Sequence, residues 1–161
     1  MLKTSNLEEQ EKQGLIYCIR LLTMTKRSES NIRQKLKEKG YDEKVAERIA
    51  TGLKAKKLLN DLEFAKAKVY WARHGNLIGK KRIAFDLRKK GLKTSVISEA
   101  LQDYDPASEK TSALELAKNR YDKLKSLDPL KRKKRIYDFL ARRGFDYEIC
   151  REVISEIEGT R

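Results

Sequence analysis

Lysine and arginine, whose side chains can bind phosphate and carboxylate groups, gather in two stretches of this 161-residue chain. Residues 80–93 hold seven of them against one Asp, and residues 131–143 also hold seven against one. The whole chain has 38 Lys and Arg against 24 Asp and Glu, a formal net charge of +14. Such a surplus favours acidic partners, either nucleic acid or an acidic protein surface. The candidate binding residues are Lys80, Lys81, Arg82, Arg88, Lys89, Lys90, Lys131, Arg132, Lys133, Lys134, Arg135, Arg142 and Arg143.

No set of residues indicates catalysis. The single histidine, His74, has no nucleophile or metal-ligand partner near it in the sequence. The stretch GNLIGKKR at residues 75–82 lacks the Gly-Lys-Ser/Thr ending of a phosphate loop and is predicted to be a turn between helices. Cys18 and Cys150 do not have metal-binding spacing, and we expect both to be small buried residues. We therefore expect no metal, no cofactor and no enzyme activity, and a helical enzyme is a distant alternative.

A short phrase occurs three times, as LKEKGY at residues 36–41, LRKKGL at 87–92 and LARRGF at 140–145. When the copies are aligned on Gly40, Gly91 and Gly144, the positions at offsets −8, −4, +1, +5, +6, +9, +10 and +13 are apolar in all three. Offsets of four put the first apolar pair on one helix face, and the later offsets form an apolar stripe on a second helix. The pattern therefore predicts a helix, a glycine stop and another helix in each copy.

The glycine is expected to end the first of these helices in the left-handed conformation, which costs glycine nothing. In such a Schellman stop the leucine four residues before the glycine contacts the apolar residue that follows it. The next helix is predicted to be capped by Asp42 in the first copy and Asp146 in the third, with Thr94 or Ser95 in the middle copy.

An additional helix precedes each phrase. Its apolar face is predicted from Leu15, Cys18 or Ile19, and Leu22 in the first copy, from Phe64, Ala67 and Trp71 in the second, and from Leu114, Ala117, Tyr121 and Leu124 in the third. Capping signals occur at Ser5–Glu8, at Asn60 with Glu63, and at Asp128 before Pro129. No segment alternates as a strand would. We therefore predict an all-α fold of three tandem three-helix repeats, residues 1–58, 59–105 and 106–161, in an elongated, slightly curved array.

The position of the cations within these helices separates two explanations of their role. Cations near a helix C-terminus offset the helix dipole by roughly 0.3–1 kcal/mol each, which accounts for residues 89–90 and 142–143. Residues 80–82 and 131–135 stand at the predicted start of a helix, where positive charge opposes the dipole. We interpret these two clusters as interaction sites, with a solvated helix face as the alternative. The spacing of Trp71 and of most tyrosines predicts that their side chains lie in the core. Stacking of these rings on nucleic-acid bases is the minor alternative.

Residues 60–101 resemble the centre of the RecX family of bacterial regulatory proteins, and residues 21–41 resemble its first unit. Glu63 stands where the family commonly has a basic residue, and the third unit matches less clearly. The matching residues are Asp61, Phe64, Ala65, Gly75, Gly79, Arg82, Ile83, Leu87, Lys89, Lys90 and Gly91. The family is made of tandem three-helix repeats, which agrees with the periodicity of the sequence.

The resemblance implies a modulator of the RecA recombinase in DNA repair, homologous recombination and the SOS response. Family members bind the RecA filament on DNA within its groove, and they generally inhibit recombinase, ATPase and co-protease activities. We expect RecA filaments as the partner, weak sequence-independent binding to single- or double-stranded DNA, a monomer, and no membrane. The N-terminus lacks a signal-peptide core, so a cytoplasmic location is expected. The alternative is a helix-turn-helix-like protein that acts on DNA directly, although no recognition helix is evident.

Overall fold

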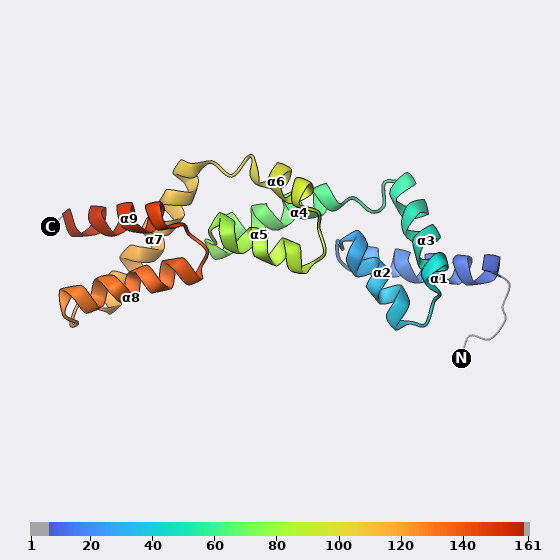
Figure 1. Ribbon diagram of the computed structural model, residues 1–161, viewed down its shortest axis with the longest axis horizontal. Coiled ribbons are helices and arrows are strands. Elements are labelled where there is room, and N and C mark those ends of the chain that lie inside the picture. The colour runs from blue at the N-terminus through green and yellow to red at the C-terminus, as the bar shows by residue number, and fades with distance from the viewer. Residues whose placement is uncertain (1–6, 160–161) are drawn as a thin grey trace. The chain divides into compact units, whose positions relative to one another are not determined.

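The computed structural model describes residues 7–159 and contains only helices in that range, so the predicted all-α fold is confirmed (Figure 1). The helices fall into three sets of three along the chain. The first set is α1 (Leu7–Met24), α2 (Glu29–Glu38) and α3 (Glu43–Ala55). The second is α4 (Asp61–Trp71), extended by a π-helical turn (Ala72–Asn76), α5 (Lys80–Lys89) and α6 (Thr94–Leu101). The third is α7 (Pro106–Lys123), α8 (Pro129–Arg142) and α9 (Tyr147–Gly159).

The described residues form two compact units, each with its own contacts. The first unit contains residues up to 65 together with 87–97, and the second contains residues 66–86 together with those from 98 onward. The middle set of helices is thus divided between the two units. The repeat boundaries at 58/59 and 105/106, and the shape of the array, stay predictions.

All three glycine phrases form the predicted helix stop. Gly40, Gly91 and Gly144 have φ angles of +93°, +77° and +88°. In each copy the N–H of the residue after the glycine donates to the carbonyl of the leucine four residues before the glycine: Tyr41 to Leu36 at 3.1 Å, Leu92 to Leu87 at 3.3 Å, and Phe145 to Leu140 at 3.3 Å. These bonds satisfy carbonyls that the end of a helix otherwise leaves without a partner.

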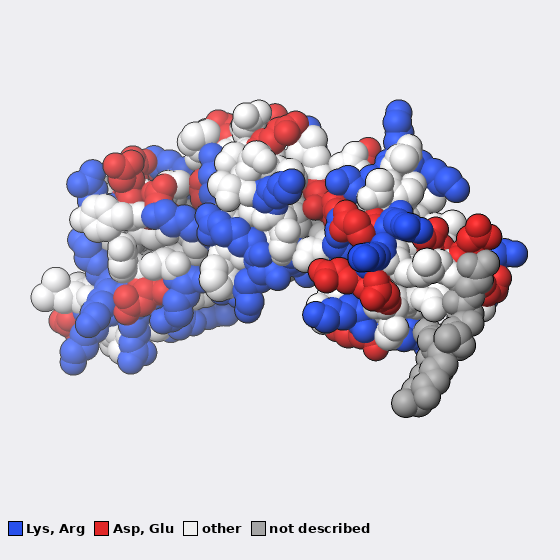
Figure 2. Space-filling model, turned by 45° about the vertical axis from the view of Figure 1, so that its right-hand side comes forward, with Lys and Arg blue, Asp and Glu red and all other residues white. Residues whose placement is uncertain are grey.

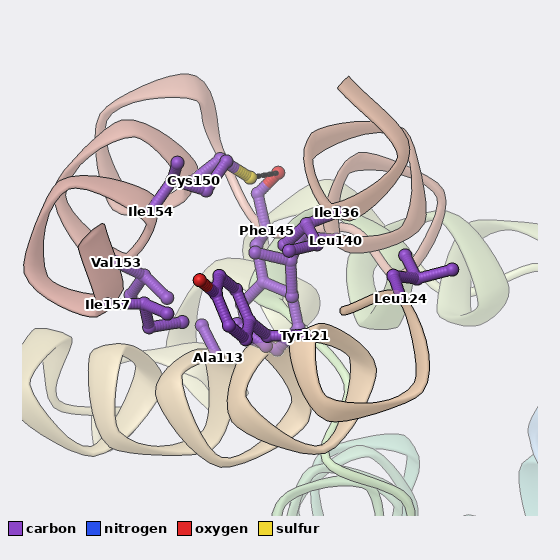
Figure 3. Close-up of a cluster of buried hydrophobic side chains, with 11 residues drawn as sticks. Ala113, Tyr121, Leu124, Ile136, Leu140, Phe145, Cys150, Val153, Ile154 and Ile157 are labelled. Carbon is purple, nitrogen blue, oxygen red and sulfur yellow. Dashed lines mark hydrogen bonds between the residues drawn. The ribbon is translucent and has the colours of Figure 1, made fainter. Parts of the chain in front are cut away.

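The apolar columns of the alignment build the cores. In the first unit, Ile32 and Leu36 of α2 pack with Val45, Ile49 and Leu53 of α3. In the second unit, α7, α8 and α9 enclose a cluster of buried hydrophobic side chains, which Figure 3 shows in close-up. That cluster is formed by Ala113, Ala117, Tyr121, Leu124, Ile136, Leu140, Phe145, Cys150, Val153, Ile154 and Ile157.

Both cysteines are buried, as predicted. Cys18 and Cys150 are fully inaccessible to solvent, and desolvation by burial raises the pKa of each thiol to about 11. A thiol with so high a pKa stays protonated at neutral pH and is a poor nucleophile. The Cys150 thiol lies against the carbonyl of Phe145, which accepts its hydrogen bond at 3.8 Å (Figure 3).

Most helix caps lie where the sequence places them. Asp42, Asn60, Asp128 and Asp146 each accept a hydrogen bond from a backbone N–H of the helix that follows. The prediction of Thr94 or Ser95 as a cap is wrong, because α6 already begins at Thr94 and its cap position falls on Lys93. Ser5, the proposed cap of the first helix, lies outside the described residues.

The predicted core role of Trp71 is also wrong. Its side chain is 66% exposed at the end of α4. The buried side of α4 instead contains Phe64, Ala65 and Val69. Trp71 stands seven residues after the buried Phe64 and so shares its helical face, but it is the last residue of α4, and spacing alone does not bury it.

Candidate cationic interface

The N-terminus of α5 lies directly against the glycine stop of α8. The N–H of Gly79 donates to the carbonyl of Arg143 at 3.0 Å, and the N–H of Lys81 donates to the carbonyl of Gly144 at 3.1 Å. A Cβ atom added to Gly79 would lie 2.4 Å from the carbonyl carbon of Gly144, so only a glycine fits there without a backbone shift. We call this contact between residues 79–82 and 143–144 the second joint.

A buried carboxylate from α7 completes the second joint. Glu109 is only 3% exposed, and its Oε1 accepts a hydrogen bond from the Lys80 N–H at 2.7 Å. Desolvation by burial raises the pKa of Glu109, while the bond from Lys80 and the charges of Lys80 and Lys81 work in the opposite direction. The charges of Lys80 and Lys81 therefore favour the ionised form of Glu109, although burial raises its pKa overall.

The second joint gives residues 80–82 a stabilising role that their position in α5 alone does not suggest. They stand at the unfavourable end of their own helix, but they also lie at the C-terminus of α8, where a helix dipole favours positive charge. The unfavourable position of these cations within α5 is therefore not the whole account of their energetics. Its interaction role stays a prediction.

The first unit contains an equivalent contact, which we call the first joint. Ser28, just before α2, donates from its hydroxyl to the carbonyl of Lys90 at 2.8 Å. The N–H of Glu29 donates to the Asp61 carboxylate at 2.7 Å. A Cβ atom on Gly91 would come within 2.4 Å of the Ser30 Cβ atom, so the glycine stop of α5 lies directly on the start of α2.

The second joint also brings together cations that are far apart in the sequence. Arg82, Arg142 and Arg143 line one open groove with Phe139, whose ring centroid lies 5.4 Å from the Arg143 guanidinium carbon. Asp86 lies in the same groove and pairs with Arg82 at 3.2 Å. The remaining lining residues are Asn76 and Ile78. An arginine-lined groove of this kind can accept phosphate or carboxylate oxygens in fixed geometry.

The cluster at residues 131–135 lies at the other end of α8, about 15 Å along the helix from Arg142 at 1.5 Å per residue. Two of its members are engaged: Arg132 lies over the Tyr121 ring at 4.4 Å, and Lys133 pairs with Glu158 at 3.3 Å. The other members, Lys131, Lys134 and Arg135, are exposed and form no ion pair with the residues that the structure describes. Their spacing puts them on one helix face.

Figure 2 shows Lys and Arg side chains crowded along the lower edge of the part of the molecule that contains α8. The third group of candidates belongs to the other unit. Arg88, Lys89 and Lys90 are exposed at the end of α5, belong to the first unit, and do not line the arginine groove. The carbonyl of Lys90 serves the first joint.

Most residues of the family motif are buried or lie at one of the two joints. Phe64, Ala65, Ile83 and Leu87 are buried. The glycines differ among themselves: Gly79 and Gly91 lie at the joints, whereas a side chain at Gly75 in the π-helical turn would meet open space. Asp61 accepts the Glu29 N–H at the first joint.

Sequence reasoning missed Ser28 and Glu109. Ser28 had a usable signal, because a serine one residue before a predicted helix is a preferred N-cap, and its hydroxyl accepts the Asn31 N–H at 3.2 Å. Glu109 had none, because a glutamate near the start of a charged helix looks like any solvated residue.

The fold and its charges define a protein of three-helix domains whose second helices are cationic. Models of the RecX family match the whole series: the first three-helix domain at residues 15–50, the second at 60–101 and the third at 108–154. Named relatives include the regulatory protein RecX of Mycobacterium sp. (strain KMS), 36% identical over 94% of this chain and 85% of the relative. The regulatory protein RecX of Mycobacterium leprae (strain Br4923) is 34% identical over 97% and 92%. The chain belongs to the RecX family of regulatory proteins.

Solved structures agree with this fold. A crystal structure of RecX from Lactobacillus salivarius superposes with a TM-score of 0.88 at 22% identity, covering 94% of this chain and 98% of that one. A crystal structure of a regulatory protein RecX superposes with a TM-score of 0.85 at 25% identity, covering 91% and 72%. The resemblance and the three-helix domains inferred from the sequence are thereby confirmed.

The relatives are named as regulatory proteins, and the expectation that this chain is not an enzyme agrees with that naming. Among residues 7–159, no three His, Cys, Asp or Glu side chains are grouped so that they could hold a metal ion. In the same range, no helix combines the length and the apolar character that crossing a bilayer requires.

Proposed function

We propose that this protein binds RecA filaments on DNA and restrains their recombinase, ATPase and co-protease activities. Family membership supports this proposal, because the resemblance to RecX proteins implies modulation of RecA. The charge of the chain supports it as well, since a filament of protein on DNA presents phosphate and carboxylate groups in regular order. A protein that only occupies such a surface needs no chemistry of its own to act.

The observation that carries the proposal is the unpaired cationic face of α8. Lys131, Lys134 and Arg135 are exposed and are not neutralised by acidic side chains within the described chain. Cations that oppose the dipole of their own helix and lack intramolecular partners contribute little to folding. Binding to an acidic partner gives them a role.

Repetition adds to the strength of such binding. When one three-helix domain has docked on a filament, the next domain is held at a high local concentration near the following subunit. Several weak contacts then add, although each alone would be easily lost. Docking along a filament groove would hinder filament growth and the conformational steps linked to ATP hydrolysis.

The test neutralises this face without touching either joint. In the triple variant Lys131→Gln, Lys134→Gln and Arg135→Gln, we expect inhibition of RecA-driven ATP hydrolysis on single-stranded DNA to require about tenfold more protein. Three exposed ionic contacts of about 0.5 kcal/mol each correspond to that factor. Arg132 and Lys133 are left intact because they pack on Tyr121 and pair with Glu158.

A matched control removes three charges elsewhere. Lys12→Gln, Arg20→Gln and Lys37→Gln change exposed residues of the first unit and lower the net charge by the same amount. This control should inhibit as the unaltered protein does. If both triple variants lose inhibition equally, net charge rather than the α8 face is responsible, and the assignment of this surface is wrong.

The helix-turn-helix-like alternative predicts a different preference. Under the proposal, the protein binds RecA on single-stranded DNA more tightly than it binds either component alone. A protein that acts on DNA directly would bind naked duplex as well as it binds the filament, with an affinity that falls steeply with salt. Parallel binding measurements on filament, RecA and DNA distinguish the two.

A further inference from the structure

Two aromatic side chains are presented to solvent at the end of α4. Trp71, the only tryptophan of the chain, is 66% exposed, and Tyr70 is 56% exposed. Their rings meet edge to face, with centroids 5.8 Å apart and an interplanar angle of 85°. The other side of the group is formed by His74, whose ring lies 4.3 Å from that of Tyr70 at 31°. Large aromatic side chains bury 150–250 Å² each when covered, so leaving two of them in water forgoes much stabilisation.

The backbone under these rings is irregular but well anchored. α4 passes into the π-helical turn, which ends at Leu77 with φ +47°. The His74 Nδ1–H donates to the carbonyl of Tyr70 at 2.9 Å. Arg73 donates to the carbonyl of Asp103 at 3.2 Å and lies over the ring of the buried Tyr104. π-Helical turns and left-handed residues gather at functional sites, where the surrounding structure supports their strain.

The chain segment that holds the rings is rich in cations. Between residues 66 and 85 the chain has six Lys or Arg residues and no Asp or Glu. The same segment continues from the aromatic rings into the arginine groove, because Asn76 and Ile78 line that groove with Arg82. Exposed aromatic rings within a cationic segment suit a ligand that has both flat apolar faces and negative charge. Unpaired nucleotides have both, since bases stack on aromatic rings while phosphates bind cations.

Another exposed aromatic residue shows that exposure alone does not favour such a ligand. Tyr147 on α9 is 60% exposed and also lies edge to face with a neighbour, Tyr137, at 6.1 Å. Its own helix holds Glu148 and Glu152 within two turns. However, Glu152 pairs with Lys110, Arg151 lies over the Tyr147 ring at 6.0 Å, and Tyr137 is only partly exposed. This pair therefore offers a base less open ring surface than Tyr70 and Trp71 do.

We propose that Tyr70 and Trp71 form a stacking platform for unpaired bases of single-stranded nucleic acid, with the cations of residues 66–82 holding its phosphates. A duplex is excluded as the ligand of this platform because its bases are already stacked on one another and their faces are covered. The inference goes beyond the proposed function, because binding of a single strand to this platform requires no RecA.

The single tryptophan makes the test direct. Titration of the unaltered protein with oligo(dT) of about 20 nucleotides should quench the fluorescence of Trp71 to saturation, because base stacking is tolerant of sequence. The Trp71→Ala variant should bind a labelled oligonucleotide, followed by anisotropy, about tenfold more weakly. Trp71→Phe keeps an aromatic face and should recover most of the lost affinity.

Two controls separate stacking from a general effect. Tyr147→Ala removes a similarly exposed ring whose face is already covered by Arg151, and it should leave the affinity unchanged. The slope of log affinity against log salt should be the same for Trp71→Ala and the unaltered protein, because that slope counts phosphate contacts. Unchanged far-ultraviolet circular dichroism and melting temperature would show that Trp71→Ala folds normally.

Three results would overturn the platform. Trp71→Ala could bind the oligonucleotide as tightly as the unaltered protein. The fluorescence of Trp71 could stay constant at saturating oligo(dT), as judged by anisotropy. Quenching could occur with RecA alone but not with oligo(dT), which would assign the aromatic rings to a protein partner. None of these results affects whether the α8 face inhibits RecA, so this inference and the proposed function can fail independently.

Discussion

The two joints connect equivalent positions of the repeat by different chemistry. Ser28 and Gly79 both stand twelve residues before a glycine stop, and Lys90 and Arg143 both stand one residue before the next stop. At the first joint a serine hydroxyl donates to the Lys90 carbonyl at 2.8 Å. At the second joint a backbone N–H donates to the Arg143 carbonyl at 3.0 Å. The polar connection is retained although the donor has changed from side chain to main chain.

The carboxylates that accept hydrogen bonds at the two joints differ as well, in this case in how exposed they are. Glu29 and Lys80 both stand eleven residues before their glycine stop, and each N–H is bound by a carboxylate from the next helix set. Asp61 at the first joint is partly exposed, whereas Glu109 at the second is buried. The comparison shows that the glycine phrase has two roles: it ends a helix, and it allows another backbone to approach that end closely.

The largest effect is expected from a methyl group at the second joint. Gly144→Ala places a Cβ atom 2.3 Å from the backbone nitrogen of Arg82 at a residue with φ +88°, and should lower the free energy of unfolding by about 3 kcal/mol or more. Gly40→Ala, at φ +93° with nothing within 4 Å, should lose only about 1–2 kcal/mol. Urea unfolding followed by circular dichroism and Trp71 fluorescence measures both. Equal losses would show that the close approach at Gly144 has no energetic weight.

A side-chain deletion should damage the first joint but has no counterpart at the second. Ser28 is 1% exposed, and Ser28→Ala removes both its bond to Lys90 and its cap on the Asn31 N–H. We expect a loss of about 2 kcal/mol in the free energy of unfolding. Ser155→Ala, at an exposed serine of α9 that takes part in neither joint, is the control and should change it by less than about 0.5 kcal/mol. A similar small change for both serines would mean that water replaces the Ser28 bonds.

Two carboxylates near the joints, those of Glu109 and Glu29, should respond to pH with opposite sign. Burial raises the pKa of Glu109 above its ordinary value of 4.5, so its contribution to stability is present below that value and is lost as pH rises through the folded-state pKa. Burial also acts to raise the pKa of Glu29, but hydrogen bonds and charges from Lys54 and Arg33 outweigh it and lower the pKa overall. The contribution of Glu29 is therefore present above its unfolded-state pKa and is lost as pH falls through the folded-state pKa.

Urea unfolding over a pH series tests this contrast with Glu109→Gln and Glu29→Gln. As pH falls from 7 toward 4.5, the unaltered protein should gain stability relative to Glu109→Gln. Relative to Glu29→Gln it should lose stability as pH falls further. Parallel curves for the two variants would contradict the difference in burial between the two carboxylates.

The smallest effect is expected from the surface ion pair of the second joint. Arg82 pairs with Asp86 at 3.2 Å on the solvent side of α5, and both side chains are about half exposed. Arg82→Gln should lower the free energy of unfolding by no more than about 0.5 kcal/mol, because exposed pairs four residues apart contribute little. Its effect should diminish further in high salt. A loss of several kcal/mol would mean that the Arg82 side chain supports the joint itself.

The amino-acid sequence by itself determined the local structure of this protein. The helices, their glycine stops and most caps depend on residues within one or two turns of each other, so spacing alone predicts them. The three-helix domains followed from the period of the phrase. The cations could also be read directly, because charge is a property of residue type.

Only the tertiary structure decided which of these residues meet. Glu109 is indistinguishable in sequence from a solvated glutamate, yet the fold buries it against Lys80. Trp71 has core spacing with the buried Phe64, yet it is exposed at the last residue of α4. The joining of Arg82 with Arg142 in one groove requires that α5 and α8 meet end to end. Such contacts depend on the packing of distant helices, whose energy is shared among many residues and has no local period.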